Sequence, residues 1–432
     1  MLAKVMNWGR QPVLVTRLNV RQYGHLGLEI LMSFLRARQE QKAVYFLRPR
    51  EVVSEALFGI DSPEVRLWPR RSDLEAYFRC RWTLDELRTH VKETRDQFLA
   101  VARKHAVRRL KQYESARPRS KAFRAALRAE EQQLVLAAQR RPDGPEALPL
   151  YYQRRLLRQK IRVQLRPEVA ERAERLAAEH GIGPDARIVS LHVREGGFKF
   201  GREMQDAKPD ARDDSVRNAR IETYFDAIDF LVARGYTVVR LGDPTMTPVR
   251  RAGVVDLATA SNRDQVVELW VLLRSDFFLS GEAGPVGVSY LTNTPLLTVN
   301  ATDPISSYPI RSDGMYIVKR VVDRQTNQPL TLRDMLSDDY LANVRNISRF
   351  RYVDNTSEDI VASVVEMLVW LRGGGEETAF QRMYRDMAVE AGDSLRARLT
   401  YVRKWGADER FMGDGRIAAF FAERYLDQPA MC

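Results

Sequence analysis

The stretch RIVSLHVREGGFKFGRE, residues 187–203, contains a run of alternating side chains that ends in charged residues and glycines. Valine and leucine alternate there with serine, histidine and arginine, which is the period-two pattern of a β-strand. The pattern predicts a strand that ends at His192 and Arg194 and is followed by a turn at Gly196 and Gly197. Because helices normally cover both faces of a parallel sheet, these polar side chains fit only near the carboxyl end of the strand, where ligands bind.

Helix and strand patterns alternate on the carboxyl side of this stretch. Apolar spacing indicates a helix over residues 220–235 that ends at Gly235, and Ser261 and Asp264 stand at capping-box spacing before the next helix. The remaining predicted elements are strands at 236–243, 253–258, 276–284 and 295–300 and a short helix at 286–294. This alternation predicts a doubly wound α/β domain, expected over residues 171–355.

A second α/β pattern occupies the amino-terminal part of the chain. A β-branched strand at 12–18, a helix after Gly24 and a strand at 42–49 form a βαβ unit, which predicts a parallel sheet. Because 432 residues exceed the size of one ordinary core, we expect two α/β domains, which often bind ligands in the cleft between them. The expected ranges are 1–170 for the first domain, with helical segment 83–165 inside it, and 356–432 for carboxyl-terminal helices that pack on the cleft or on the first domain.

The composition excludes several classes of protein. No run of about 18 apolar residues occurs, so we expect no membrane-spanning segment. Cys80 and Cys432 lie far apart in the sequence, which argues against a disulfide framework, and the first residues lack the layout of a signal peptide. These features predict a cytoplasmic protein, with attachment at the inner face of the membrane as an alternative.

The positive charge of the chain is concentrated in one segment. Residues 90–165 hold 19 Lys and Arg against 7 Asp and Glu, which equals the net charge of +12 of the whole chain. Two interpretations stay open: a solvated outer face of helices, or a surface for an anionic partner such as a membrane, a lipid-linked acceptor, or an acidic protein or glycan. No recognisable RNA-binding module accompanies the charge, so no nucleic-acid partner is expected.

Polar or glycine residues end all five strands of the second α/β pattern. The carboxyl ends of parallel strands meet at one edge of the sheet, so these residues are expected to lie near one another. Glycines there allow backbone amides to approach an anion, and an arginine offers a planar fork of donors to a phosphate. The combination predicts a site for an extended anionic ligand such as a nucleotide. The strand-end residues are Arg194, Arg240, Gly242, Asp243, Asp256, Ser280, Gly281, Glu282, Gly284 and Asn300.

The segments HVRE, VRNARIETYFDAIDFLVARGYTVVRLGD and SDFFLSGEAGPVGVSYLTNTPLLTVN together resemble a bacterial glycosyltransferase family, over roughly residues 185–340. The shared pattern is H-x-R-E, a later R-N before a tyrosine-containing helix, R-x-G-D, and a glycine loop followed by P-x-x-x-N. This family is similar in turn to fucosyltransferases with an H-x-R motif and, more distantly, to ADP-heptose transferases. The resemblance implies the GT-B architecture of two Rossmann-like domains that face each other across a cleft, with the sugar nucleotide bound mainly by the second domain, and a role in polysaccharide biosynthesis.

The resemblance also implies roles for individual residues. Arg194 would bind the donor diphosphate and act in catalysis, with His192 beside it. Glu282 departs from the small hydroxyl residues expected in the glycine loop; it would contact ribose or sugar hydroxyls, since a carboxylate repels phosphate. The predicted donor-binding set is His192, Glu195, Lys199, Arg217, Asn218, Arg240, Asp243, Ser280, Gly281, Glu282, Gly284 and Asn300.

His25 is the candidate general base, because it follows the first strand at a position that faces the donor in a two-domain cleft. The alternative is that His25 only caps or packs the following helix. No D-x-D follows a strand, and Asp213 and Asp214 are interpreted as a solvated turn, so neither a metal nor a cofactor besides the sugar nucleotide is expected. The predicted reaction is inverting transfer of a sugar, with GDP-fucose favoured as donor, to a glycan, lipid-linked glycan or protein hydroxyl. The alternative function is non-catalytic binding of a nucleotide or polyanion.

Overall fold

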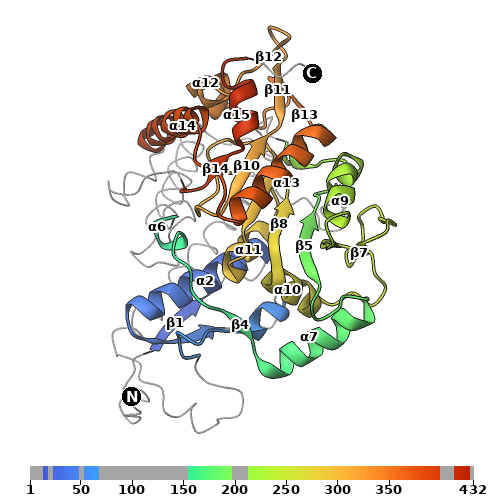
Figure 1. The fold of residues 1–432 in the computed structure, drawn as a ribbon. Coiled ribbons are helices and arrows are strands. Elements are labelled where there is room, and N and C mark those ends of the chain that lie inside the picture. The colour runs from blue at the N-terminus through green and yellow to red at the C-terminus, as the bar shows by residue number, and fades with distance from the viewer. Residues whose placement is uncertain are drawn as a thin grey trace, which may run out of the picture. The chain divides into compact units, whose positions relative to one another are not determined.

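A computed structural model describes residues 13–17, 23–47, 53–67, 154–196, 213–398 and 413–428 (Figure 1). Lys199 and most of the basic segment 90–165 lie outside these residues. The chain divides into two compact units: residues 1–17, 37–46 and 66–149 form one, and residues 18–36, 47–65 and 150–432 form the other. The predicted domain boundaries at residues 170 and 355 stay a prediction.

The second unit is built on a seven-stranded sheet in which every neighbouring pair of strands is parallel. The strands lie in the order β14-β10-β9-β8-β5-β6-β7. The chain thus runs outward from β5 through β6 to β7, then returns to the other side of β5 to form β8, β9 and β10. The strands are β5 (Arg187–His192), β6 (Tyr236–Arg240), β7 (Val254–Asp256), β8 (Ser275–Ser280), β9 (Leu296–Ala301), β10 (Met315–Val318) and β14 (Arg416–Ile417).

Helices cover both faces of this sheet, which confirms the predicted α/β class. Helix α9 contacts β6 and packs beside α13, whereas α10 contacts β5 and β8 and packs against α7 (Figure 1). The strands are apolar almost throughout, and Val189 and Leu191 of β5 are fully buried. The helices are α7 (Pro167–Glu179), α9 (Phe225–Val232), α10 (Gln265–Arg274), α11 (Pro285–Thr292) and α13 (Ser357–Leu371).

Two predicted helix starts were wrong by about one turn. Asp264 is itself the N-cap of α10, and its carboxylate accepts a hydrogen bond from the backbone nitrogen of Val266 at 2.8 Å. The helix therefore begins after Asp264, and Ser261 lies outside it. The carboxylate of Asp264 caps the helix because it accepts from a backbone donor that has no partner within the helix. Before α9, residues Ile221–Tyr224 form a separate 3₁₀ turn, η5.

The sequence did not predict the strands that follow β9. Besides β10, a small antiparallel sheet forms from β11 (Arg320–Asp323), β12 (Gln328–Pro329) and β13 (Phe350–Val353). The prediction of helices alone after residue 355 was also wrong, since β14 closes the edge of the large sheet beside β10. The remaining elements in this part are η6 (Asp334–Leu336), α12 (Asp338–Ala342), α14 (Ala379–Arg398) and α15 (Ala419–Tyr425).

The amino-terminal elements occur where the sequence predicted them, as β1 (Val13–Arg17), α2 (Tyr23–Gln39) and β2 (Ala43–Leu47). Strands β1 and β2 form a two-stranded sheet. In the second unit, β3 (Ile60–Asp61) pairs antiparallel with β4 (Gln164–Leu165), and η1 (Ala56–Gly59), η4 (Asp214–Arg217) and α6 (Arg154–Leu157) complete the described elements. Over the part of the chain described, no helix is long and apolar enough to cross a membrane.

Candidate functional site

The candidate site lies where the path of the chain reverses, between β5 and β8. His192 and Ser280 end these strands opposite each other, and the backbone nitrogen of Gly281 donates to the carbonyl oxygen of His192 at 3.3 Å. The connections after the two strands lead to opposite sides of the sheet. In open α/β sheets this is the point at which ligands bind.

Arg194 follows β5 at this point and carries a charge that no described carboxylate pairs. Its Nη1 donates to the side-chain oxygen of Asn218 at 2.9 Å and to the carbonyl oxygen of Asp214 at 2.5 Å, and both acceptors are neutral. Burial, together with the nearby positive charge of Arg217, lowers the pKa of Arg194 to about 10. An anionic ligand would relieve both effects, because it would supply the missing counter-charge.

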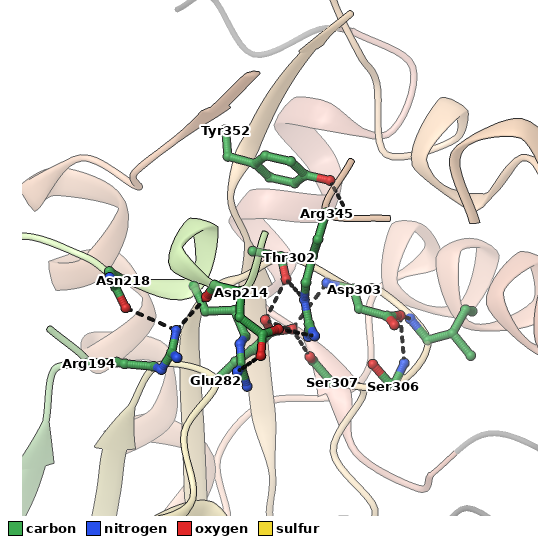
Figure 2. A network of polar contacts seen from close by, with 12 residues as sticks. Arg194, Asp214, Asn218, Glu282, Thr302, Asp303, Ser306, Ser307, Arg345 and Tyr352 are labelled. Carbon is green, nitrogen blue, oxygen red and sulfur yellow. Dashed lines mark hydrogen bonds and ion pairs between the residues drawn. The ribbon is translucent and has the colours of Figure 1, made fainter. Parts of the chain in front are cut away.

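Two further arginines lie beside Arg194, and we call Arg194, Arg217 and Arg345 the arginine cluster. The carboxylate of Asp214 forms ion pairs with Arg217 at 2.9 Å and with Arg345 at 3.5 Å. Figure 2 shows Asp214 between Arg194 and Arg345. Burial lowers the pKa of Arg217, as does the charge of Arg345, and its Nε is buried without a hydrogen-bond partner. The cluster therefore brings three guanidinium groups from distant parts of the sequence to one edge of the sheet.

Glu282 fixes Arg345 on the other side of the cluster (Figure 2). Its carboxylate pairs with Arg345 at 3.1 Å and accepts hydrogen bonds from the Thr302 hydroxyl at 2.5 Å, the Asp303 backbone nitrogen at 3.1 Å and the Ser307 hydroxyl. Burial alone would raise the pKa of Glu282, but Arg345 and these donors outweigh it and leave the pKa below its ordinary value. Glu282 is thus an ionised, buried anchor. A contact with ribose or sugar hydroxyls stays a prediction.

Arg240, Glu195 and Asp256 form a separate buried network at the ends of β5, β6 and β7. Arg240 is fully buried and pairs with Glu195 at 2.7 Å and with Asp256 at 3.1 Å. Asp243, which follows β6, accepts from the backbone nitrogen of Thr245 at 3.0 Å. Nη1 and Nη2 of Arg240 are therefore engaged within the protein, whereas its buried Nε has no hydrogen-bond partner. Donor binding by Glu195, Arg240 and Asp243 remains a prediction.

His192 is held neutral at the end of β5. Burial lowers its pKa to about 4, and the neighbouring Arg240 acts in the same direction. Its Nδ1 is buried and has no hydrogen-bond partner, and the same holds for the Ser190 hydroxyl on the same face of the strand. A neutral imidazole with an unused nitrogen can donate to or accept from a polar ligand group. A contact of His192 with a donor stays a prediction.

His25 lies in the first turn of α2, where burial lowers its pKa. The preceding Gly24 packs so closely on the start of α11 that a Cβ there would lie 2.1 Å from the carbonyl oxygen of Gly284. The same contact excludes a Cβ at Gly287, which would lie 2.3 Å from the carbonyl oxygen of Gly24. The glycines thus bring the first turn of α2 to the loop that leaves β8, while the role of His25 as a base stays a prediction.

The side chains of Ser280 and Asn300 are engaged within the protein. Ser280 donates to the carbonyl oxygen of Gly281 at 2.9 Å. Asn300 and Asn355 exchange backbone-to-side-chain hydrogen bonds, both at 2.7 Å, and Asn300 also donates to the Tyr224 hydroxyl at 3.1 Å. Asn300 adopts a left-handed backbone conformation with φ of 57°, which asparagine tolerates better than most residues. Their predicted contacts with a donor are untested.

Sequence reasoning missed Arg345 and misjudged Asp214. The interpretation of Asp213 and Asp214 as a solvated turn agrees with the turn η4 and with the 45% exposure of the Asp214 side chain, but it missed that Asp214 pairs with two arginines. Asp213 caps this turn by accepting from the backbone nitrogen of Ser215 at 2.7 Å. One signal could have pointed to Arg345, since the tripeptide Val-Arg-Asn occurs at both 216–218 and 344–346. Within the described part of the chain, no group of three or more His, Cys, Asp or Glu is arranged to hold a metal ion.

Comparisons with known proteins give one weak structural match. No protein-family model matches the chain, and neither does any curated protein. Among solved structures, the chain is similar to the glycosyl transferase family 9 protein from Veillonella parvula DSM 2008, with a TM-score of 0.25 and 13% identity. The similarity covers 37% of this chain and 42% of that one. Because a TM-score of 0.25 does not establish a common fold, the proposals below rest on the residues of this chain.

Proposed function

We propose that this protein is a glycosyltransferase of GT-B type that uses a nucleoside diphosphate sugar and binds the donor diphosphate through Arg194. The single observation that supports it most is that Arg194, which pairs with no described carboxylate, lies where the chain leaves β5 and β8 toward opposite sides of the sheet. A nucleotide diphosphate is the ligand chemistry that this point in an open α/β sheet commonly takes. The H-x-R resemblance favours a GDP-sugar, with GDP-fucose first, and an acceptor hydroxyl on a glycan, lipid-linked glycan or protein.

In this proposal the sugar is transferred by a single displacement. The acceptor oxygen attacks the anomeric carbon, its bond to that carbon forms while the bond to the diphosphate oxygen breaks, and the configuration inverts. His25 takes the acceptor proton, which its lowered pKa permits because a neutral imidazole is the form that accepts one. Arg194 stabilises the charge that develops on the leaving diphosphate, with no metal ion required in the proposed step.

The test is thermal unfolding of the protein in the presence of GDP-fucose, GDP-mannose, UDP-glucose, ADP-heptose and GDP. A ligand at about 100 times its Kd stabilises a protein by about 2.7 kcal/mol, and a hundredfold loss of affinity reduces that gain to about 0.4 kcal/mol. We expect Arg194→Ala to lose the gain in this way. Arg220→Ala is the matched control, because Arg220 is exposed on the same stretch of chain.

Turnover separates this proposal from the alternative of a non-catalytic binding protein. We expect slow hydrolysis of the bound donor by the wild-type protein, and we expect His25→Ala to abolish transfer while the nucleotide still stabilises the variant. Stabilisation by polyanions such as heparin, without stabilisation by any nucleotide, would favour the alternative, for which the charge of segment 90–165 is the motivation.

A further inference from the structure

Asp214 contacts all three members of the arginine cluster. Its carbonyl oxygen accepts from Arg194 at 2.5 Å, and its carboxylate pairs with Arg217 at 2.9 Å and with Arg345 at 3.5 Å. Figure 2 shows this residue in the middle of the network, with Glu282 and the hydroxyl groups beyond it. The cluster is therefore organised around one acidic residue, whose carboxylate pairs with two of the three arginines.

The two acidic residues that pair with this cluster differ in how firmly they are held. Glu282 is 6% exposed and accepts hydrogen bonds from three partners besides its arginine. The Asp214 side chain is 45% exposed, and it belongs to the four-residue turn η4 (Asp214–Arg217). A partly exposed ion pair contributes little stability, so the carboxylate of Asp214 can be exchanged for another anion at small cost.

Of the two arginines that pair with Asp214, Arg345 has partners that hold it without that carboxylate. Arg345 keeps its pair with Glu282 at 3.1 Å and its hydrogen bond to the Thr302 hydroxyl at 2.9 Å. Its backbone nitrogen donates to the Tyr352 hydroxyl at 2.6 Å. Arg217 has a buried Nε without a partner, which a ligand oxygen or water can use. Arg345 is thus positioned independently of the carboxylate, and Arg217 has a donor left over for a ligand.

We propose that Arg217 and Arg345 form a second anion subsite beside Arg194, which the Asp214 carboxylate fills in the free protein and which a phosphoryl group takes when it binds. Arg194 holds one phosphoryl group of a diphosphate and this pair holds the other. The carboxylate then turns toward solvent. The inference rests on the proposed function only in that the ligand is a diphosphate, and no sugar transfer is required for it.

The test is calorimetric titration of the full chain with inorganic pyrophosphate. Asp214→Asn keeps the size of the side chain and removes the competing charge. Since two partly exposed ion pairs no longer oppose the ligand, we expect the Kd for pyrophosphate to fall about tenfold. Asp213→Asn is the matched control, because it makes the same change of charge one residue away, on a carboxylate bound to Ser215 rather than to arginine. The control should change the Kd less than about twofold.

A second pair of variants keeps the test decisive if one of them folds poorly. Asp214→Ser should also tighten binding, and Arg217→Ala combined with Asp214→Asn should remove the gain. Thermal unfolding without ligand reports whether each variant is folded. The proposal is overturned if Asp214→Asn leaves the Kd unchanged or raises it, if Asp213→Asn gives an equal gain, or if no variant binds pyrophosphate. A failure here leaves the proposed function to be judged by the sugar-nucleotide titration of Arg194→Ala.

Discussion

The network of Arg240, Glu195 and Asp256 predicts a large loss of stability when its single cation is removed. Arg240 is fully buried at the edge of the sheet, where its positive charge balances two carboxylates. It also donates to the carbonyl oxygen of Thr247 at 2.7 Å. We expect Arg240→Met to lower the free energy of unfolding, because methionine fills similar space and leaves both carboxylates without a counter-charge.

The loss of unfolding free energy in Arg240→Met depends on the hydrogen bonds that the two carboxylates keep. Breaking a buried ion pair from one side costs about 3–5 kcal/mol. Asp256 keeps hydrogen bonds from the backbone nitrogen of Val249 and the Thr259 hydroxyl, both at 2.9 Å, and Glu195 keeps two from Thr247 at 2.8 Å. Because the carboxylates retain these donors, we expect a value near the lower end, about 3 kcal/mol.

The assay is equilibrium unfolding in urea, followed by far-ultraviolet circular dichroism. Arg333→Met is the control, because the ion pair of Arg333 with Asp427 is about half exposed and its loss should not change the midpoint. Adding Glu195→Gln and Asp256→Asn to Arg240→Met should restore at least half of the loss, since no buried charge then remains unbalanced. A loss below about 1 kcal/mol for Arg240→Met, or no recovery in the triple variant, would refute the reasoning.

Three further predictions concern the ends of β5 and β9 and the start of α2. Because His192 has a folded-state pKa of about 4 against an ordinary value of 6.5, the unfolded chain takes up the proton first, and stability falls as the pH drops through this window. Between pH 7 and pH 5 the wild type should lose about 2 kcal/mol more than His192→Gln in urea titrations; equal losses would contradict this. Gly24→Ala should cost about 2–3 kcal/mol, since its Cβ would meet a carbonyl oxygen at 2.1 Å, whereas Gly183→Ala, with open space around it, should be neutral in the same thermal measurement. Asn300→Ala should lower the free energy of unfolding by about 1 kcal/mol more than Asn300→Gly, because only glycine adopts its backbone conformation freely; a reversed order would show that the backbone is not the cause.

The sheet from β5 to β9 could be predicted because each of its strands is recognisable from its own short stretch of sequence. These strands are apolar runs that end at glycines, caps or charged residues, as the strand at 187–192 does. The helix at 357–371 is recognisable in the same way, from its own apolar spacing. The position of Arg194 was predictable for the same reason, since an isolated charge on an apolar strand belongs at its end.

The strand after Gly314 and the arginine cluster depend on partners that are distant in the sequence. Lys319 interrupts an apolar run and argues against a buried strand, yet it is 3% exposed and pairs with Asp354 at 2.5 Å. Arg345 meets Asp214 from 131 residues away. In the sequence, a buried charged residue whose ion-pair partner is distant cannot be distinguished from a surface residue, because only the fold brings the two partners together.

The edge position of β14 has a consequence for the order in which the protein is assembled on the ribosome. Arg416 pairs with Met315, so the outer edge of β10 has no partner until about a hundred further residues have been translated. At ordinary elongation rates of about 5–20 residues per second, the nascent sheet presents this open edge for several seconds. Because an unpaired edge is a template for other strands, β10 is the place where premature pairing with another chain is expected during that interval.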